Sequence, residues 1–425
     1  MNFSSIASSG NLTCVVCFAQ FLAYLDSGFW PALLPELSRT WSLSNRDAGW
    51  ITATHYAAYL ISAPPLLALT DRFSSKSIYL FGLITTAAGA LCFAFVANDL
   101  YGAMASRILS GLGEAGRFMV AVKILSDHLE TAALSRGIAW NALTIGIASA
   151  ISFLSIDPIA HLLGWRVAYI IAACATIFGL LIVWHLVPRT NRNHVGARTP
   201  NSNFDLWPVV KNRTAMTYVL AYSVHTFESV AFRGWVVAFL AYVATNSIFH
   251  PATPAPTVIA TAMVLLGTGA SFLGNEIALR LGRDPLIFFA FITSSTLAAL
   301  IAFIGVRLYS LSVVLVLVYA VCIYLDSATL TAGTSSSAEP SRRGATLAVH
   351  STLGYAGGVL GPIVVGSVLD VTGGMSQRAW ALVFLLLSLL DVLGLACFWL
   401  LRPRGQYSKR TSNEDIASHN DTISR

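Results

Sequence analysis

The chain has 425 residues, of which 56% are apolar and only 11% are charged. A soluble domain carries about a quarter charged residues, so this composition excludes an ordinary cytosolic enzyme and makes the lipid bilayer the expected solvent. The six cysteines all lie inside apolar runs, which indicates packing residues and not a disulfide scaffold.

Apolar stretches long enough to cross a bilayer, about 20 residues each, occur twelve times along the chain. Their expected limits are 12–36, 47–69, 77–97, 100–125, 137–157, 167–187, 214–243, 257–279, 285–305, 309–336, 344–370 and 379–401. Spans seven and ten are long enough to tilt or break. Prolines and a glycine run are expected to interrupt other helices, at Pro31, Pro35, Pro64, Pro65 and 357–362.

The distribution of lysine and arginine predicts the orientation of the chain. An even number of spans places both termini on one side, and cytoplasmic loops retain positive charge. With both termini in the cytoplasm, 18 of the 26 basic residues face that side, five face the other side and three lie inside spans. We therefore expect a multi-pass protein of the plasma (inner) membrane with both termini cytoplasmic. The net charge of +6 then indicates topology and not a nucleic-acid partner.

The longest polar stretch divides the chain into two sets of six spans. We expect an N-terminal six-helix bundle over 1–187, a cytoplasmic linker over 188–213 and a C-terminal six-helix bundle over 214–401. Residues 402–425 are polar and rich in serine and asparagine, which predicts a disordered cytoplasmic tail.

Ionisable residues deep in a membrane are costly, so each one suggests a function. Seven of the eight lie on every third span, which predicts three-helix units around a central polar site, as in transporters built from repeats. They are Asp26 in span one, Arg107, Glu114 and Arg117 in span four, Glu228 and Arg233 in span seven, Asp326 in span ten and Asp391 in span twelve. Tyr-Leu-Asp-Ser occurs twice, at 24–27 and 324–327, which supports an internal duplication.

Four short motifs accompany this pattern. The loop after span two reads Leu-Ala-Leu-Thr-Asp-Arg-Phe-Ser-Ser-Lys at 67–76, and the loop after span eight contains Gly-Asn-Glu at 274–276 and Arg-Leu-Gly-Arg at 280–283. Span four contains Arg107-x-x-x-Gly111-x-Gly113, and span six opens with Gly-Trp-Arg at 164–166. With these motifs, residues 10–402 resemble the major facilitator superfamily of secondary transporters.

The resemblance implies an all-α membrane protein with 12 transmembrane helices in two pseudo-symmetric six-helix bundles, and a central cavity lined by helices 1, 4, 7 and 10. It also implies gating roles for residues of the two loop motifs, namely Asp71, Arg72, Gly274, Arg280 and Arg283. The first loop lacks both glycines of the family pattern, because Leu67 and Ser74 stand in their places. The alternative is that this charged loop only retains topology.

Arginines in a membrane cavity suggest an anionic substrate, because guanidinium stays charged and binds carboxylate or phosphate through two hydrogen bonds. The predicted substrate-binding residues are Arg107, Arg117, Arg233 and Asp26. Asp26 and Arg107 lie about 13 and 12 Å below the outer ends of their helices, so they can meet. The alternative is that each arginine neutralises a resident carboxylate.

Burial disfavours the charged form of a carboxyl group, which suits proton exchange. The predicted proton-coupling residues are Glu228, Asp326 and Glu114. Glu228 and Arg233 are five residues apart and point about 140° away from each other on a helix. His225, one turn before Glu228, is a relay candidate, with a packing role as the alternative. The sequence offers no role for Asp391.

The sequence predicts alternating-access secondary active transport, specifically proton-coupled symport of a small organic anion. The alternative is proton-driven efflux of amphipathic drugs or metabolites. Nucleotide-binding, zinc-hydrolase and serine-hydrolase motifs are missing, which argues against a pump or an enzyme. The expected partners are a small-molecule substrate, protons and membrane lipid, with no nucleic acid, no metal and no other cofactor, and we expect a monomer.

Overall fold

The computed structural model describes residues 9–70, 72–188, 206–247, 254–305 and 307–402. Asp71, most of the expected linker and the expected tail from 403 lie outside these described residues. The first set of helices is α1 (Ser9–Ala23), α2 (Phe29–Thr40), α3 (Asn45–Leu69), α4 (Ser75–Val96), α5 (Leu100–His128), α6 (Thr131–Leu163) and α7 (Trp165–Leu186).

The second set begins with a short helix inside the range predicted for the linker. It comprises α8 (Trp207–Lys211), α9 (Arg213–Asn246), α10 (Pro256–Leu281), α11 (Arg283–Leu300) with the π-helix η3 (Ile301–Gly305), α12 (Tyr309–Tyr324), α13 (Ser327–Ser337), the 3-10 helix η4 (Pro340–Arg342), α14 (Arg343–Val371) and α15 (Gln377–Leu401).

Each predicted span coincides with one helix or with two consecutive helices, and the described residues contain no strand. The all-α class is therefore confirmed. Nine helical segments of the described chain are long and apolar enough to cross a membrane. The spans that fail this criterion are the pair α1 and α2, and the helices α3 and α5. The helices α1 and α2 are too short, at 15 and 12 residues, whereas α3 and α5 are long enough but less apolar.

Two spans are broken, and both breaks fall on the repeated Tyr-Leu-Asp-Ser motif. The chain leaves the helix between Ala23 and Phe29, and again between Tyr324 and Ser327. Of the two spans long enough to tilt or break, span ten is thus broken, whereas span seven is not, because α9 runs unbroken for 34 residues.

The interruptions expected at Pro35, at the Pro64–Pro65 pair and in the 357–362 run are wrong, whereas span one is interrupted just before Pro31. Helices α2, α3 and α14 continue through Pro35, the Pro64–Pro65 pair and Pro362. Pro31 lies in the first turn of α2, where proline removes no helical hydrogen bond. In both broken spans the helix ends at a turn that contains a buried aspartate.

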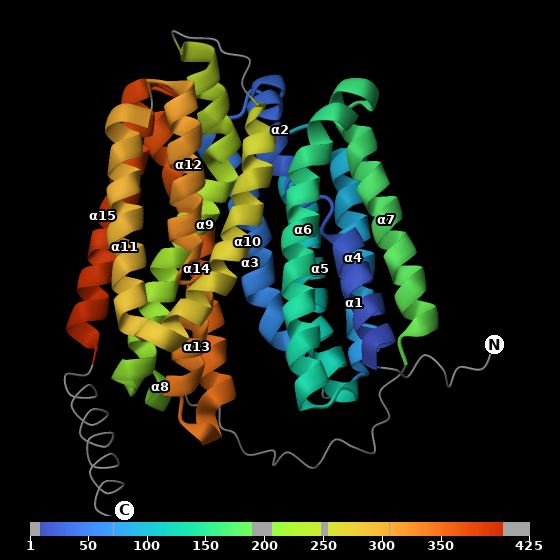
Figure 1. The fold of residues 1–425 in the computed structure, drawn as a ribbon. Helices are drawn as coiled ribbons and strands as arrows, with labels where there is room; N and C mark the ends of the chain where they lie inside the picture. Colours follow the sequence, from blue (N-terminus) through green and yellow to red (C-terminus); the bar gives the residue numbers. More distant parts are fainter. Residues whose placement is uncertain (1–8, 71, 189–205, 248–253, 306, 403–425) are drawn as a thin grey trace, which may run out of the picture.

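The two sets of helices lie side by side (Figure 1), with α1–α7 on one side and α9–α15 on the other. The sets meet where α3 packs on α14 and where α6 packs on α10. Helix α1 begins and α15 ends at the same end of the molecule, called here the near end. The far end is the opposite one, where α2 ends and α3 begins.

Hydrogen bonds join the two sets at the far end. The Asp370 carboxylate accepts bonds from the backbone amides of Asn45 and Arg46, at 3.0 and 2.8 Å, and from the Asn45 side chain at 2.8 Å. Asp370 at the end of α14 therefore caps the N-terminus of α3. Thr257 of α10 also donates to the Asp157 carboxylate of α6. These contacts hold the far end closed.

Contacts between the sets continue towards the middle of the molecule. The rings of Tyr59, just past the middle of α3, and Tyr355 of α14 stack with centroids 4.1 Å apart. Gly366 of α14 lies against Asn45, where an added Cβ would come within 2.3 Å of the Asn45 carbonyl oxygen. Glycine is required at this close approach.

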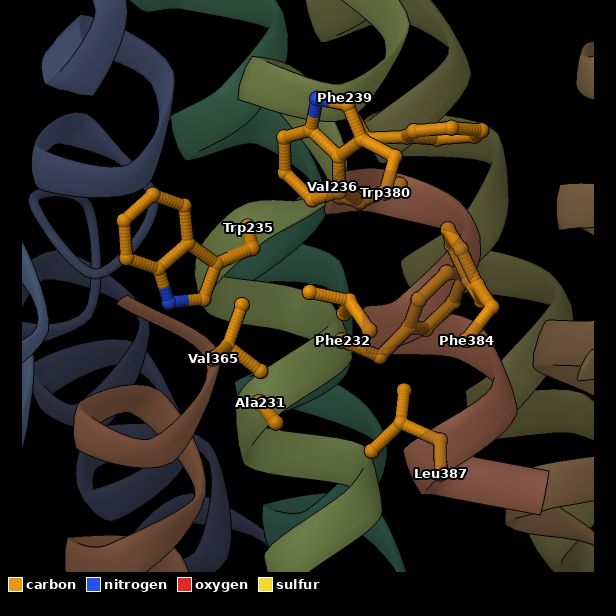
Figure 2. A pocket seen from close by; sticks show the side chains of 10 residues that line it. Ala231, Phe232, Trp235, Val236, Phe239, Val365, Trp380, Phe384 and Leu387 are labelled. Carbon is orange, nitrogen blue, oxygen red and sulfur yellow. The ribbon is translucent and has the colours of Figure 1, made fainter. Parts of the chain in front are cut away.

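The far half of the second set has an apolar core where α9, α14 and α15 meet (Figure 2). Its cavity of about 10 Å³ has room for about one water molecule. Trp380 packs edge to face with Phe239, with ring centroids 5.3 Å apart. Trp235 points away from Phe239 and Phe384 and donates to the Pro362 carbonyl at 3.2 Å. We call these residues, with Ala231, Phe232 and Leu387, the apolar core.

Candidate functional site

A cavity of about 70 Å³ collects charged residues from both sets of helices. Most of its lining comes from the α1–α2 break, α3 and α5, and Arg233 is contributed by α9. The charged and aromatic lining residues are Tyr24, Asp26, His55, Tyr56, Arg107, Glu114, Arg117 and Arg233. A larger cavity of about 500 Å³ lies between α1 and α6 but has Arg136 as its single charged lining residue. Convergent charge makes the smaller cavity the candidate site.

Both carboxylate oxygens of Glu114 have partners within the first set. The Tyr24 hydroxyl donates to one oxygen at 2.9 Å, and the His55 ring nitrogen Nε2 lies 2.8 Å from the other. Tyr24 belongs to the α1–α2 break and His55 to α3. Through these two contacts, Glu114 links the first residue after α1 and helix α3 to α5.

Arg117 is held in place by three neighbours. Its guanidinium group donates to the Gln20 side chain at 3.2 Å and to the Thr86 hydroxyl at 3.3 Å, and it lies 3.8 Å from the centre of the Tyr24 ring. As predicted from their spacing of three residues, Arg117 and Glu114 share one face of α5 and line the same cavity.

Arg107 and Arg233 differ from Arg117 in their surroundings. Neither forms a hydrogen bond or an ion pair with another described residue, and the buried Nε of Arg107 has no partner. Asp26 and Arg107 line the same cavity, as their depths predicted. However, among the described residues no ion pair joins them. Among the described residues, none of the three cavity arginines therefore forms an ion pair with a carboxylate of the chain.

A second buried cluster lies inside the second set of helices, around Glu228 and Asp391. The Tyr319 hydroxyl of α12 donates to Glu228 at 2.6 Å, and the Ser294 hydroxyl of α11 donates to Asp391 at 2.6 Å. The two carboxyl groups are within hydrogen-bonding reach of each other. This arrangement accounts for Asp391, whose side chain enters the cluster from α15.

Asp326 completes this cluster from the second helix break. His225 Nδ1 lies 2.9 Å from the Asp326 carboxylate, and both side chains are buried. His225 therefore contacts Asp326, and no hydrogen bond or ion pair joins it to Glu228 among the described residues. His350 stacks on Tyr222 at 3.9 Å and contacts the hydroxyl of Thr334 at 3.1 Å, which is a packing arrangement.

Those residues expected to act in gating that the structure describes lie towards the near end. Arg283 donates to Ser336 of α13, Arg280 and Arg72 are exposed, and Asp71 lies outside the described residues. Gly274 packs against the α12–α13 break, where an added Cβ would lie 1.7 Å from the Leu325 carbonyl oxygen. The structure thus gives Gly274 a packing role at the broken helix.

Four residues that contact the predicted charged groups were missed from the sequence, namely Tyr24, Tyr319, Gln20 and Thr86. Tyr24 and Tyr319 carry no charge, so a search for buried charges does not find them, although both are tyrosines on spans that carry such charges. The repeated motif containing Tyr24 was the available signal. For Gln20 and Thr86 the sequence gives no signal, because polar residues of this kind occur throughout the spans.

The Major Facilitator Superfamily sequence profile matches residues 16–325. The chain belongs to this superfamily. Among curated relatives, Protein spinster homolog 3 of Danio rerio is 24% identical over 292 residues, which cover 64% of this chain and 59% of that protein. The Niacin transporter NiaP of Acinetobacter baylyi is 27% identical over 160 residues, which cover 37% of this chain and 36% of that protein.

Solved structures agree with the superfamily fold. A crystal structure of the nucleoside transporter NupG matches with a TM-score of 0.75 at 15% identity, covering 92% of this chain and 99% of that one. By contrast, the matched segments span between about a third and three fifths of the length of the two curated relatives. The superfamily fold is therefore shown, and the relative in Acinetobacter baylyi is named as a transporter.

Proposed function

We propose that the protein is a secondary active transporter that works by alternating access and takes up a small organic anion together with protons. The near end is then cytoplasmic, as the distribution of basic residues predicts, and the closed far end faces outwards. We also propose two six-helix bundles, at 1–187 and 214–401, joined by a cytoplasmic linker at 188–213 and followed by a cytoplasmic tail at 402–425. The protein is placed in the inner membrane as a monomer.

The observation that carries the proposal is the pair Arg107 and Arg233. Both guanidinium groups line the charged cavity, and neither has an ion-pair partner among the described residues. A buried guanidinium without a carboxylate is costly unless an anion binds it. The relative in Acinetobacter baylyi is a niacin transporter, and niacin carries a carboxylate, which agrees with this chemistry.

Protons are assigned in this proposal to the second cluster. Glu228 lies 3% exposed on α9, its partners are a hydroxyl and another carboxyl group, and no described arginine or lysine pairs with it. Glu114 and Asp326 each contact a histidine. We assign the proton exchanged during transport to Glu228, with Asp26 and Arg117 completing the substrate cavity and Arg72, Arg280 and Arg283 acting at the near end.

A binding screen tests the proposal. Purified protein is heated with niacin, benzoate, inorganic phosphate or ethidium, and the shift in melting temperature is recorded. A ligand at 100 times its Kd adds about 2.7 kcal/mol of stability. We expect stabilisation by an anion, with affinity about tenfold or more weaker in Arg107→Lys. The exposed Arg378→Lys serves as the matched control.

Stabilisation by ethidium alone would favour the efflux alternative. Uptake in proteoliposomes then tests proton coupling, because an imposed pH gradient should drive accumulation of radiolabelled niacin or of the anion found in the screen. If accumulation does not depend on the pH gradient, proton coupling is contradicted, whereas anion transport itself is not.

A further inference from the structure

We propose that Glu228 and Asp391 form one proton-binding site in which two carboxyl groups share a single proton. This inference rests on the proposed function, because it assigns the proton-binding partner that the transport cycle requires. It makes Asp391, on helix α15, part of the coupling site.

The geometry of the pair carries this inference. The side chains of Glu228 and Asp391 are within hydrogen-bonding reach of each other, and the residues are only 3% and 0% exposed. Two carboxylates in contact and out of water repel strongly, whereas a shared proton converts the repulsion into a hydrogen bond.

The hydrogen bonds around the pair leave one acceptor oxygen without a donor. Tyr319 donates to one oxygen of Glu228, and Ser294 donates to Oδ2 of Asp391. Oδ1 of Asp391 is buried and has no hydrogen-bond donor among the described residues. A buried acceptor left without a donor is costly. A proton on the neighbouring Glu228 carboxyl group supplies that donor.

The neighbouring charged groups are few. Asp326 adds negative charge from the α12–α13 break, and His225, one turn earlier on α9, contacts Asp326 at 2.9 Å. In the described part of the chain, no arginine or lysine forms an ion pair with Glu228 or Asp391. A proton is therefore the cation that balances the pair.

The apolar core, drawn in Figure 2, lies on the far side of the pair. Ala231 lies three residues after Glu228 on α9, and Leu387 lies four residues before Asp391 on α15, so both are one helical turn away. Phe232 packs edge to face on Tyr319, with centroids 4.8 Å apart. This core separates the shared proton from water at the far end.

Infrared spectroscopy of the purified full-length protein tests the pair without any substrate. A pH titration in the wild type should reveal a carboxylic acid band that Asp391→Asn and Glu228→Gln each shift and that the double variant removes. Tyr319→Phe and Ser294→Ala disturb packing less, and they should shift the band but retain it. Asp99→Asn, at the exposed N-cap of α5, is the control and should leave the band unchanged, because asparagine caps helices as well as aspartate.

A band identical in the wild type and in folded Asp391→Asn would overturn the shared proton, whatever transport shows. Niacin flux in proteoliposomes gives the second readout. We expect Asp391→Asn to abolish accumulation driven by a pH gradient and to retain substrate exchange, which needs no proton release. A shifted band with normal pH-driven accumulation would instead overturn the role of the pair in coupling.

Discussion

At Glu114, each carboxylate oxygen has its own partner, the Tyr24 hydroxyl or the His55 ring. The pair formed with His55 joins α3 to α5 and is mostly hidden from solvent, with side-chain exposures of 13% and 18%. Such contacts position a carboxylate, because the donors fix its orientation on two sides. Glu114 therefore differs from Glu228, whose neighbour is a second carboxyl group.

Removing His55 should destabilise the first set of helices. His55→Ala leaves one oxygen of Glu114 without its partner, which costs about 1–3 kcal/mol and should lower the melting temperature in detergent. In a double-mutant cycle with Glu114→Gln, the loss in the double variant should be smaller than the sum of the single losses. Additive losses would show that the 2.8 Å contact contributes no stability.

Two of the cavity arginines, Arg117 and Arg233, should respond differently to replacement by lysine. Arg117 has bonds to Gln20 and Thr86 and lies over the Tyr24 ring, and lysine cannot reproduce the planar fork. Arg117→Lys should therefore lower the melting temperature. Arg233→Lys should retain stability and weaken anion binding about tenfold or more, measured by thermal shift. Equal losses of stability in both variants would contradict this division.

The broken helices explain several features at the scale of elements. Each break falls at a Tyr-Leu-Asp-Ser sequence, so the aspartate of that sequence enters the interior from a turn. The break at Asp326 also sets the packing of α10, because Gly274 lies directly against the Leu325 carbonyl. Helix α10 approaches the broken helix more closely than any larger residue at 274 would permit.

Glycine replacements along α10 test this close approach. An added Cβ at Gly274 would lie 1.7 Å from a backbone oxygen, whereas Gly269 of the same helix has no atom within 4 Å of the added Cβ. Gly274→Ala should cost about 1–3 kcal/mol, and Gly269→Ala should gain up to about 1 kcal/mol from helix propensity. Melting temperatures of the two variants should move in opposite directions. Equal shifts would show that contact with the break is unimportant.

The Asp370 contact is the clearest link between the two sets at the scale of the whole molecule. Asp370→Ala removes three hydrogen bonds that join α14 to the N-terminus of α3. Their loss should shift the equilibrium at least about tenfold towards an open far end, because each bond to a charged group contributes about 1.5–3 kcal/mol.

Pulsed electron resonance measures this shift. Spin labels at the exposed positions Tyr101 and Arg378, at the far ends of α5 and α15, report the distance between the sets. Asp370→Ala should broaden the distribution towards longer distances, and Asp99→Asn, which caps its own helix only, should leave it unchanged. An unaltered distribution in Asp370→Ala would show that other contacts keep the far end closed.

The sequence was sufficient for the spans and for the charge-bearing helices, because both follow from local composition and from the cost of buried charge. It also predicted that Glu228 and Arg233 face different surroundings, because helical spacing fixes that angle. It did not predict the partner of Glu228. Asp391 reaches it from the last helix through packing within one set, and such a contact leaves no periodic signal. Proline misled the prediction of breaks, because packed helices tolerate it.

The unbroken helix α9 has a consequence for how two ligands would influence each other. Arg233 lines the cavity and Glu228 contacts Asp391. Arg233 and Glu228 belong to the same continuous helix of 34 residues. Any movement of α9 that an anion stabilises also changes the surroundings of the proton. Thermodynamic linkage then requires reciprocity. The factor by which protonation changes anion affinity must equal the factor by which the anion changes proton affinity, so an affinity measured across pH would count the protons that accompany each anion.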